Sequence, residues 1–347
     1  MHTPFTTDIL LVSSPNNGGI SLVSNQTVTV LDRSDTTGLC LMDTALYRNA
    51  MARNCNSKVM QLQTITDFVQ VILEQGVQYD FHDILRYEDR LYLVSTGTNE
   101  VIILKLNGSE AKRYAYPGGN DSWHINCLGI WDDRVVVSAF GEFDGYRSYK
   151  GKTSKQGFIL DLESNTKLWE GLSQPHTPIQ YRGNYYICNS EEMQVLVKEQ
   201  DSSITHCIQL DGYTRGIAFS DKFMYVGLSE SRNKTDITRH GQSRIVALDI
   251  KTREIHGQVF LPFNEIYDIR RIENLSVVPA IFQLADIDTL HEWSAQYANL
   301  EIEFNNMRSQ FQRVNEHWLA GKMLELIRRI KGDASFGNPD FKSSPPE

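Results

Sequence analysis

Residues 81–104 read FHDILRYEDRLYLVSTGTNEVIIL, and this stretch contains the pattern that decides the fold. Three short apolar runs are separated by a turn at Glu88 and Asp89 and by the polar segment 96–99. Apolar runs of this length, bounded by turn residues, predict antiparallel β-strands rather than helices. A histidine, His82, opens the unit, so the pattern predicts a small β-sheet with a polar residue at its start.

Similar units follow one another along the chain, at intervals of about 40 to 50 residues. The units start near Gly38, His82, His124, His176, Arg215 and Asp268. Such a period, with several short strands in each unit, is typical of β-propeller blades. We expect an all-β propeller with six blades over residues 1–280; a seven-bladed ring and an open sandwich are the alternatives.

The last unit is incomplete after Ile272. The N-terminal segments 8–14 and 19–23 have the same pattern of apolar residues as the strands that are missing from the last unit. A ring closed by pairing these segments with the last unit leaves no exposed strand edge between its ends. We therefore expect N-terminal strands to close the last blade.

The hydrophobic period changes from about residue 288. Apolar and aromatic residues then follow a three-four spacing, which is typical of an α-helical coiled coil: Leu290, Trp293, Tyr297, Leu300, Phe304, Met307, Phe311, Val314 and Trp318. We expect a helical heptad segment over 285–331, with residues 288–331 forming a homo-oligomer or binding a partner protein. Packing of this segment back onto the propeller is the alternative, and the tail 332–347 is expected to be disordered.

Composition excludes several classes of function. The formal net charge of −9 argues against nucleic-acid binding, which needs a basic surface. We find no basic N-terminal signal and no apolar stretch long enough to span a membrane, so we expect no transmembrane span and a cytoplasmic protein. The end of the helical segment, 322–331, is basic and amphipathic, so peripheral contact with the inner membrane is a further alternative.

Three histidines, His82, His124 and His176, begin three successive units. Residues at one phase of successive blades point toward one axis, so we expect the three imidazoles at one rim of the ring. Three imidazoles with an open position are typical of a catalytic metal site, with Mn²⁺, Zn²⁺ and Ca²⁺ as candidate ions. Recognition of a ligand without metal and structural hydrogen bonding are the alternatives.

Charged residues near the same phase extend this candidate site. Arg215 and Arg232 suit a carboxylate or phosphate, which arginine binds bidentately. Glu142 or Asp268 is expected to act as the general base beside His124. Inter-blade salt bridges are the alternative for the two arginines.

Several motifs resemble an uncharacterised bacterial family of propeller-like proteins. They are FHDI (81–84), WHINCLGI (123–130), SQPHTPIQY (173–181), GYTRGIAF (212–219) and VGLSESR (226–232). The resemblance covers about residues 5–275 and implies that the site residues cluster. Besides those already named, the cluster contains the expected substrate-binding residues Asp83, Asn126, Asp144, Asn189 and Glu265. It implies no particular reaction.

Two functions remain open from the sequence. The first is an enzyme at the propeller mouth that acts on an anionic small molecule or saccharide, by metal-assisted lyase, epimerase or hydrolase chemistry. The second is a non-catalytic propeller scaffold that binds a glycan, a nucleotide-sugar or a protein and is assembled through residues 288–331.

Overall fold

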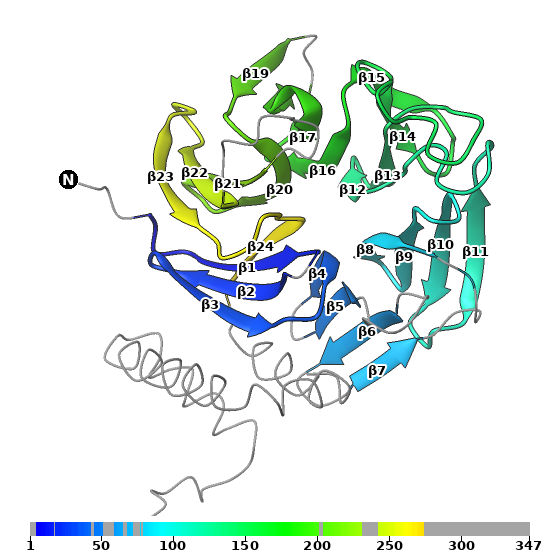
Figure 1. Ribbon diagram of the computed structural model, residues 1–347, viewed down its shortest axis with the longest axis horizontal. Coiled ribbons are helices and arrows are strands. Elements are labelled where there is room, and N and C mark those ends of the chain that lie inside the picture. The colour runs from blue at the N-terminus through cyan, green and yellow to red at the C-terminus, as the bar shows by residue number, and fades with distance from the viewer. Residues whose placement is uncertain are drawn as a thin grey trace, which may run out of the picture.

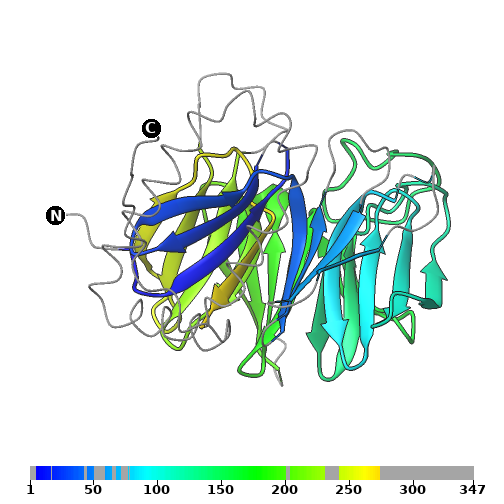
Figure 2. The same cartoon turned by 90° about the horizontal axis from the view of Figure 1, so that it is seen from below.

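The computed structural model describes residues 5–16, 18–42, 45–50, 59–64, 68–71, 77, 79–200, 204–230 and 242–273. These residues form six four-stranded antiparallel sheets around a central axis, as Figure 1 shows. Seen from the side, in Figure 2, the sheets stand next to one another around the ring. The predicted all-β propeller class is confirmed.

Each sheet is a blade, named here by its innermost strand. The β24 blade contains β24 (Asp268–Ile272), β1 (Ile9–Ser14), β2 (Gly19–Ser24) and β3 (Thr27–Asp32). The β4 blade contains β4 (Thr36–Met42), β5 (Ala45–Ala50), β6 (Val59–Thr64) and β7 (Phe68–Val71). The β8 blade contains β8 (Phe81–Tyr87), β9 (Arg90–Ser95), β10 (Glu100–Lys105) and β11 (Glu110–Ala115).

Three further blades complete the ring. The β12 blade contains β12 (Leu128–Trp131), β13 (Arg134–Ala139), β14 (Gly157–Asp161) and β15 (Lys167–Leu172). The β16 blade contains β16 (Pro175–Tyr181), β17 (Asn184–Asn189), β18 (Gln194–Lys198) and β19 (Thr205–Gln209), with a short 3-10 helix at Ser190–Glu192. The β20 blade contains β20 (Tyr213–Phe219), β21 (Phe223–Ser229), β22 (Arg244–Asp249) and β23 (Ile255–Phe260).

The ring is closed by strands from both ends of the described chain. β1 pairs antiparallel with β24, with Val12 opposite Ile269, and β2 and β3 complete the same sheet. This is the predicted closure by N-terminal strands. It gives β24 a partner and removes an open edge that could pair with another molecule.

The sequence of each strand matches its distance from the axis. The middle strands are packed on both faces by neighbouring blades, so strands such as β13 (RVVVSA) and β21 (FMYVGLS) are buried almost throughout. The outermost strand β11 (EAKRYA) is polar and mostly exposed. Two-residue hairpin turns need positive φ angles, and Asp132 and Asp133 adopt φ of 47° and 60°.

Apolar clusters between adjacent blades hold the ring together. One cluster joins Val94 and Val101 of the β8 blade to Val137 and Phe158 of the β12 blade. Complete burial of such a side chain contributes roughly 1.5–3 kcal/mol. These clusters form the walls between blades and leave the axis to polar groups.

Hydrogen bonds at one phase of the inner strands also connect the blades. Asp83 accepts from the amides of Ile84 (2.8 Å) and Leu128 (2.7 Å), the latter in the next blade. Asp268 does the same with Ile269 (2.8 Å) and with Leu39 of the next blade (3.2 Å).

These contacts change the interpretation of two predicted site residues. Asp83 and Asp268 are both about 5% exposed, and they bind backbone amides of neighbouring blades rather than facing a ligand. Asp268 was predicted as a general base and Asp83 as a substrate-binding residue. Their carboxylates serve instead to connect blades, because a buried amide needs an acceptor.

The predicted helical segment 285–331 and the tail 332–347 lie outside the described residues, as does Arg232. Among the residues that are described, no helix has the length and apolar character needed to cross a membrane.

Candidate active site

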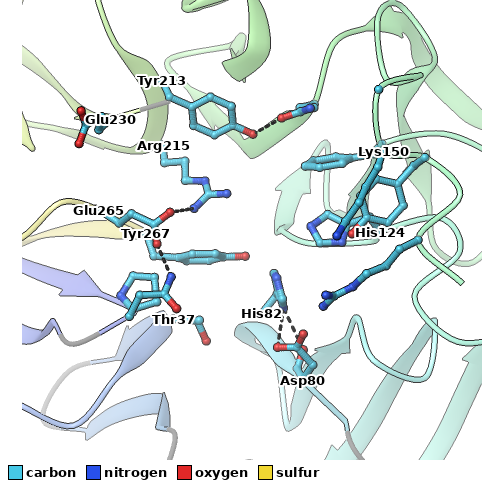
Figure 3. Close-up of a pocket in the computed structure, with 17 residues that line it drawn as sticks. Thr37, Asp80, His82, His124, Lys150, Tyr213, Arg215, Glu230, Glu265 and Tyr267 are labelled. Carbon is cyan, nitrogen blue, oxygen red and sulfur yellow. Dashed lines mark hydrogen bonds and ion pairs between the residues drawn. The ribbon is translucent and has the colours of Figure 1, made fainter. Parts of the chain in front are cut away.

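A cavity of about 550 Å³ opens beside the inner strands, and Figure 3 shows the side chains that surround it. Every blade contributes residues to its lining, but the outermost strand of each sheet contributes none. The lining residues are Pro15, Asn16, Thr37, Asp80, His82, His124, Phe140, Arg147, Tyr149, Lys150, Gly151, Gln174, Tyr213, Arg215, Glu230, Glu265 and Tyr267. Two predicted histidines and the predicted Arg215 and Glu265 are thus brought together.

His82 and His124 lie side by side in this cavity. Their ring centroids are 5.2 Å apart and the rings meet edge to face. His82 Nδ1 is 2.9 Å from the backbone oxygen of Asp80 and 3.4 Å from its Oδ1. His124 Nδ1 is 2.8 Å from Asp121 Oδ1. Both imidazoles are therefore oriented through Nδ1, which leaves the Nε2 edge of His124 for a ligand.

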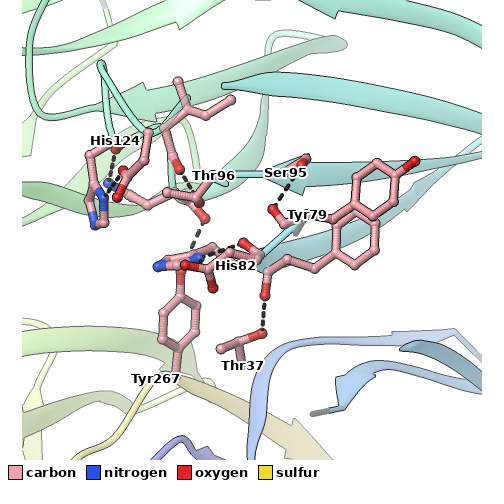
Figure 4. A network of polar contacts seen from close by, with 12 residues as sticks. Thr37, Tyr79, His82, Ser95, Thr96, His124 and Tyr267 are labelled. Carbon is pink, nitrogen blue, oxygen red and sulfur yellow. Dashed lines mark hydrogen bonds and ion pairs between the residues drawn. The ribbon is translucent and has the colours of Figure 1, made fainter. Parts of the chain in front are cut away.

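The backbone that precedes His82 is held in place by hydroxyl groups, as Figure 4 shows. Ser95 Oγ donates to the carbonyl of Tyr79 at 2.8 Å. Thr37 Oγ1, from the neighbouring β4 blade, donates to the carbonyl of Phe81 at 2.7 Å. These bonds fix the direction in which His82 leaves its strand.

Asp121 is the buried residue that orients His124. Its Oδ2 accepts from Arg147 Nε at 2.6 Å and from Tyr149 Oη at 3.2 Å. Burial alone would raise the pKa of Asp121, but hydrogen bonds and charge from His124 and Arg147 lower it below its ordinary value. Asp121 therefore stays ionised and can stabilise a protonated His124.

The backbone at the rim of the cavity is unusual. Asp80, Asp121, His124, Arg147 and Gln174 adopt positive φ angles between 43° and 52°. Side chains other than glycine seldom occupy this left-handed region, and such residues persist where the surrounding structure holds them, often at functional sites. Other non-glycine residues with such φ angles lie in turns throughout the described chain, so these angles show that the rim is held in tight turns and do not by themselves indicate a function.

Arg215 lies on the side of the cavity opposite the two histidines (Figure 3). Its guanidinium carbon lies 5.0 Å from the ring centre of Tyr213 and 5.5 Å from that of Tyr267. Arg215 Nη1 is 3.8 Å from Glu265 Oε1, and Asn16 donates to the other oxygen of Glu265. The aromatic rings hold the guanidinium in place without using up its hydrogen-bond donors.

His176 lies behind this lining and is 1% exposed. Its Nδ1 is 2.9 Å from the carbonyl of Gln174 and 2.8 Å from Ser190 Oγ. Burial, followed by the charges of Arg215 and His124, lowers the pKa of His176 well below its ordinary value. The imidazole is therefore neutral.

The three histidines do not form the predicted metal centre. Within the described part of the chain, no group of three or more His, Cys, Asp or Glu side chains is placed to hold a metal ion. The physical reason lies in the register. His82 and His176 each lie five residues before the last residue of their strand, Tyr87 and Tyr181, whereas His124 lies seven residues before Trp131.

Asn126 therefore occupies the phase of the other two histidines in the β12 blade. His124 was predicted to share their phase because each histidine opens its unit, but the inner strand of that blade begins only at Leu128, and His124 precedes it. The three histidine side chains are therefore not placed around one common position, and we propose no metal-dependent step.

Comparison with known proteins gives a family but no activity. Residues 68–281 match a family described as a domain of unknown function, DUF4915. The chain belongs to the DUF4915 family. The predicted resemblance to an uncharacterised family is confirmed at that level. No curated protein matches the chain.

Solved structures resemble this DUF4915 chain in fold. A crystal structure of a nidogen/laminin complex matches with a TM-score of 0.56 and 9% identity, covering 76% of this chain and 97% of that one. A protein of unknown function from Bacteroides caccae matches with a TM-score of 0.54 and 10% identity, covering 78% of this chain and all of that one (100%). Identities this low show the propeller fold alone.

Besides Asp83, Asp268 and His176, four more predicted site residues of the DUF4915 chain lie away from the cavity lining. Glu142 and Asp144 are exposed, and Glu142 pairs with Lys167 at 3.1 Å. Asn126 and Asn189 are buried and bonded within the fold: Asn126 accepts from Ser138 Oγ at 2.6 Å, and Asn189 accepts from the amide of Ser173 at 2.6 Å.

Sequence reasoning missed Asp121, Arg147 and Tyr267. A signal existed for Tyr267, which precedes Asp268 as His82 precedes Asp83. Asp121 stands three residues before His124, a spacing that carries no meaning until a turn brings the two side chains together. Arg147 comes from a long loop between β13 and β14, where no repeat predicts its position.

Proposed function

We propose that the cavity binds a small, hydroxyl-bearing organic acid such as a sugar acid and catalyses proton transfer on it, as in a lyase or an epimerase. One observation carries the proposal. Two imidazoles 5.2 Å apart face a fixed arginine across one cavity. This combination supplies both an anchor for a carboxylate and groups that move a proton.

The anchor is Arg215, aided by other cations of the lining. Arginine binds a carboxylate through two parallel hydrogen bonds, which fixes the plane of the bound group. Arg147 and Lys150 add positive charge to the lining from the opposite loop. The lining also contains the carboxylates of Asp80, Glu230 and Glu265, so its formal charge is neutral, and Arg215 would hold an anion through directed hydrogen bonds rather than through net charge.

The proton-transfer group is His124. Its Nδ1 proton is held by the ionised Asp121, so Nε2 has the lone pair that can remove a proton from the carbon next to a bound carboxylate. Because the ring of His82 lies beside that of His124, the two imidazoles face the same side of a bound carbon. His82 is therefore placed to protonate the hydroxyl oxygen that leaves as water in a lyase, which favours a lyase over an epimerase.

The decisive experiment is solvent exchange in D₂O, followed by NMR, with a panel of sugar acids. We expect wild-type protein to exchange the proton next to the carboxylate and the His124→Gln variant to lose that exchange while still binding the acid. Exchange that persists in His124→Gln would rule out His124 as the base.

A second candidate is non-catalytic binding of a saccharide. The rings of Phe140, Tyr149, Tyr213 and Tyr267 line the cavity, and aromatic faces suit the apolar face of a sugar ring. Tight binding of a sugar acid with no exchange and no product in the same experiment would favour this candidate.

We further propose that residues 288–331 assemble the protein, on the heptad pattern of their sequence. Sedimentation of the full chain against a chain ending at residue 285 tests this. The full chain should sediment as an oligomer and the shortened one as a monomer; identical behaviour would contradict the proposal. We also propose that the protein is cytoplasmic.

A further inference from the structure

Two buried polar atoms beside the cavity have no hydrogen-bond partner among the described residues. They are Nε2 of His176 and Nε of Arg215. Buried polar groups are almost always satisfied, so each such atom calls for an explanation. The explanation must fit the chemistry of both atoms.

The chemistry of His176 Nε2 follows from its surroundings. Ser190 Oγ donates its proton to the carbonyl of Thr214 at 2.6 Å, so toward His176 it can only accept. The carbonyl of Gln174 also accepts. Nδ1 of this neutral imidazole therefore carries the proton, and Nε2 is an acceptor. Arg215 Nε can only donate.

The two atoms lie in the same small region. The ring of His176 is 5.7 Å from that of Tyr213 and 6.5 Å from that of Tyr267, and the Arg215 guanidinium contacts the same two rings. The next residues along the two strands are hydrogen bonded to each other, since Thr177 Oγ1 accepts from the amide of Gly216 at 3.0 Å. An acceptor and a donor thus lie beside the same two aromatic rings, and both of these rings line the cavity.

We propose that His176 Nε2 and Arg215 Nε together bind one hydroxyl group of the ligand. A hydroxyl accepts from Arg215 and donates to His176, whereas a carboxylate oxygen could satisfy only the arginine. This inference rests on the proposed function and deepens it. The site selects acids that carry a hydroxyl group near the carboxylate, and it rejects acids of the same shape without one.

Binding of a matched pair of acids tests the selection. D-glucuronate and tetrahydropyran-2-carboxylate share a six-membered ring and a carboxylate, but only the first has ring hydroxyls. We expect wild-type protein to bind D-glucuronate roughly ten- to hundredfold more tightly in calorimetric titration, and His176→Phe, which keeps a ring of similar size, to lose that preference.

The outcomes separate the two proposals. Equal binding of both acids by wild-type protein, or a preference that survives in His176→Phe, would overturn the hydroxyl site and leave the cavity function intact. Binding of neither acid would contradict the proposed function together with it. A water retained between the two atoms in a high-resolution structure of the D-glucuronate complex would also overturn the site, because the ligand hydroxyl would not reach it.

One measurement needs no ligand and no variant that must fold. The ¹⁵N chemical shifts of the His176 ring report which nitrogen carries the proton. We expect the neutral Nδ1–H form at neutral pH. A proton on Nε2 would overturn the proposal, since that nitrogen could then accept nothing.

Discussion

His124 Nδ1 and Asp121 Oδ1 are 2.8 Å apart, and Asp121 is itself held by Arg147 and Tyr149. The pair resembles, in geometry, the arrangement in which a carboxylate sets the tautomer of a catalytic histidine. It lies in a cavity that also contains a fixed arginine.

Replacing Asp121 with asparagine should lower kcat for proton exchange by roughly 10²–10⁴-fold. The amide can no longer stabilise a protonated His124, while the size of the side chain is unchanged. KM should change little, because Asp121 does not line the cavity. Steady-state kinetics with the active sugar acid measures both constants.

The matched control is Asp80→Asn. The carbonyl of Asp80 still orients His82 at 2.9 Å after this change, whereas the carboxylate lies farther away at 3.4 Å. A loss of kcat in Asp80→Asn as large as in Asp121→Asn would show that the two positions do not differ as the structure indicates.

Replacing Arg215 with glutamine should weaken binding of a carboxylate ligand roughly 10- to 100-fold. The neutral amide cannot form the paired, charged hydrogen bonds. Arg182→Gln is the control, since Arg182 lies in the turn between β16 and β17, pairs with the exposed Asp221 and does not line the cavity. Calorimetric titration of both variants compares them, and equal affinity of Arg215→Gln and Arg182→Gln would exclude Arg215 as the anchor.

The buried Asp83 should lower stability as the pH rises from about 4 to about 7, against the opposite effect of His176, whose lowered pKa favours folding as the pH rises toward 6.5. Burial, and then the nearby Asp268, raise the pKa of Asp83 from 3.8 to about 7, against the opposing charge of Arg270. The folded protein thus holds a proton that the unfolded chain releases near pH 4. Stability is greatest below that pH and is lost up to the folded pKa, by about 4 kcal/mol at most for this group.

Urea unfolding at a series of pH values measures this loss. Asp83→Asn should be less stable at low pH, because one of the two amides that Asp83 binds loses its acceptor. It should also lack the decline between pH 4 and 7. A difference in stability between wild-type protein and Asp83→Asn that stays constant over this range would contradict the protonation of Asp83, because the effect of His176 cancels in that difference.

Gly129→Ala should destabilise the ring by roughly 1–3 kcal/mol or more. A Cβ atom at Gly129 would lie 1.9 Å from the carbonyl oxygen of Pro178 in the next blade, and backbone cannot move aside as a flexible side chain can. Gly145→Ala is the control, because the nearest atom there is 3.9 Å away. Equal melting temperatures for the two variants would mean that the blades are not packed this closely.

Some features of the fold and site were accessible from the sequence. Alternating apolar runs with turn residues such as Asp132 and Asp133 are local signals, so strands and hairpins could be predicted. The closing strand was accessible because an incomplete last unit needs a partner. Arg215, Glu265 and His82 were found by their phase in the repeats, and His124 was found although its phase differs from that of His82.

The errors share a cause. Asp83, Asp268, Asn126 and Asn189 look like site residues in sequence because they are polar at a repeated phase. Whether such a residue faces a ligand or a buried amide depends on the neighbouring blade, and no local pattern contains that information. His124 was assigned to the wrong phase for a related reason, since the start of its strand is set by pairing with β13.

The sequence by itself determined that this protein is a ring of repeated small sheets with polar groups toward its axis, because strand formation follows from side-chain alternation and turn chemistry within a few residues. Only the tertiary structure decided which polar groups meet. Asp121 reaches His124, and Arg147 reaches Asp121 from a distant loop, through contacts that form when the blades close around the axis. Hydrogen bonds and charges act over a few ångströms in space, whatever the separation along the chain.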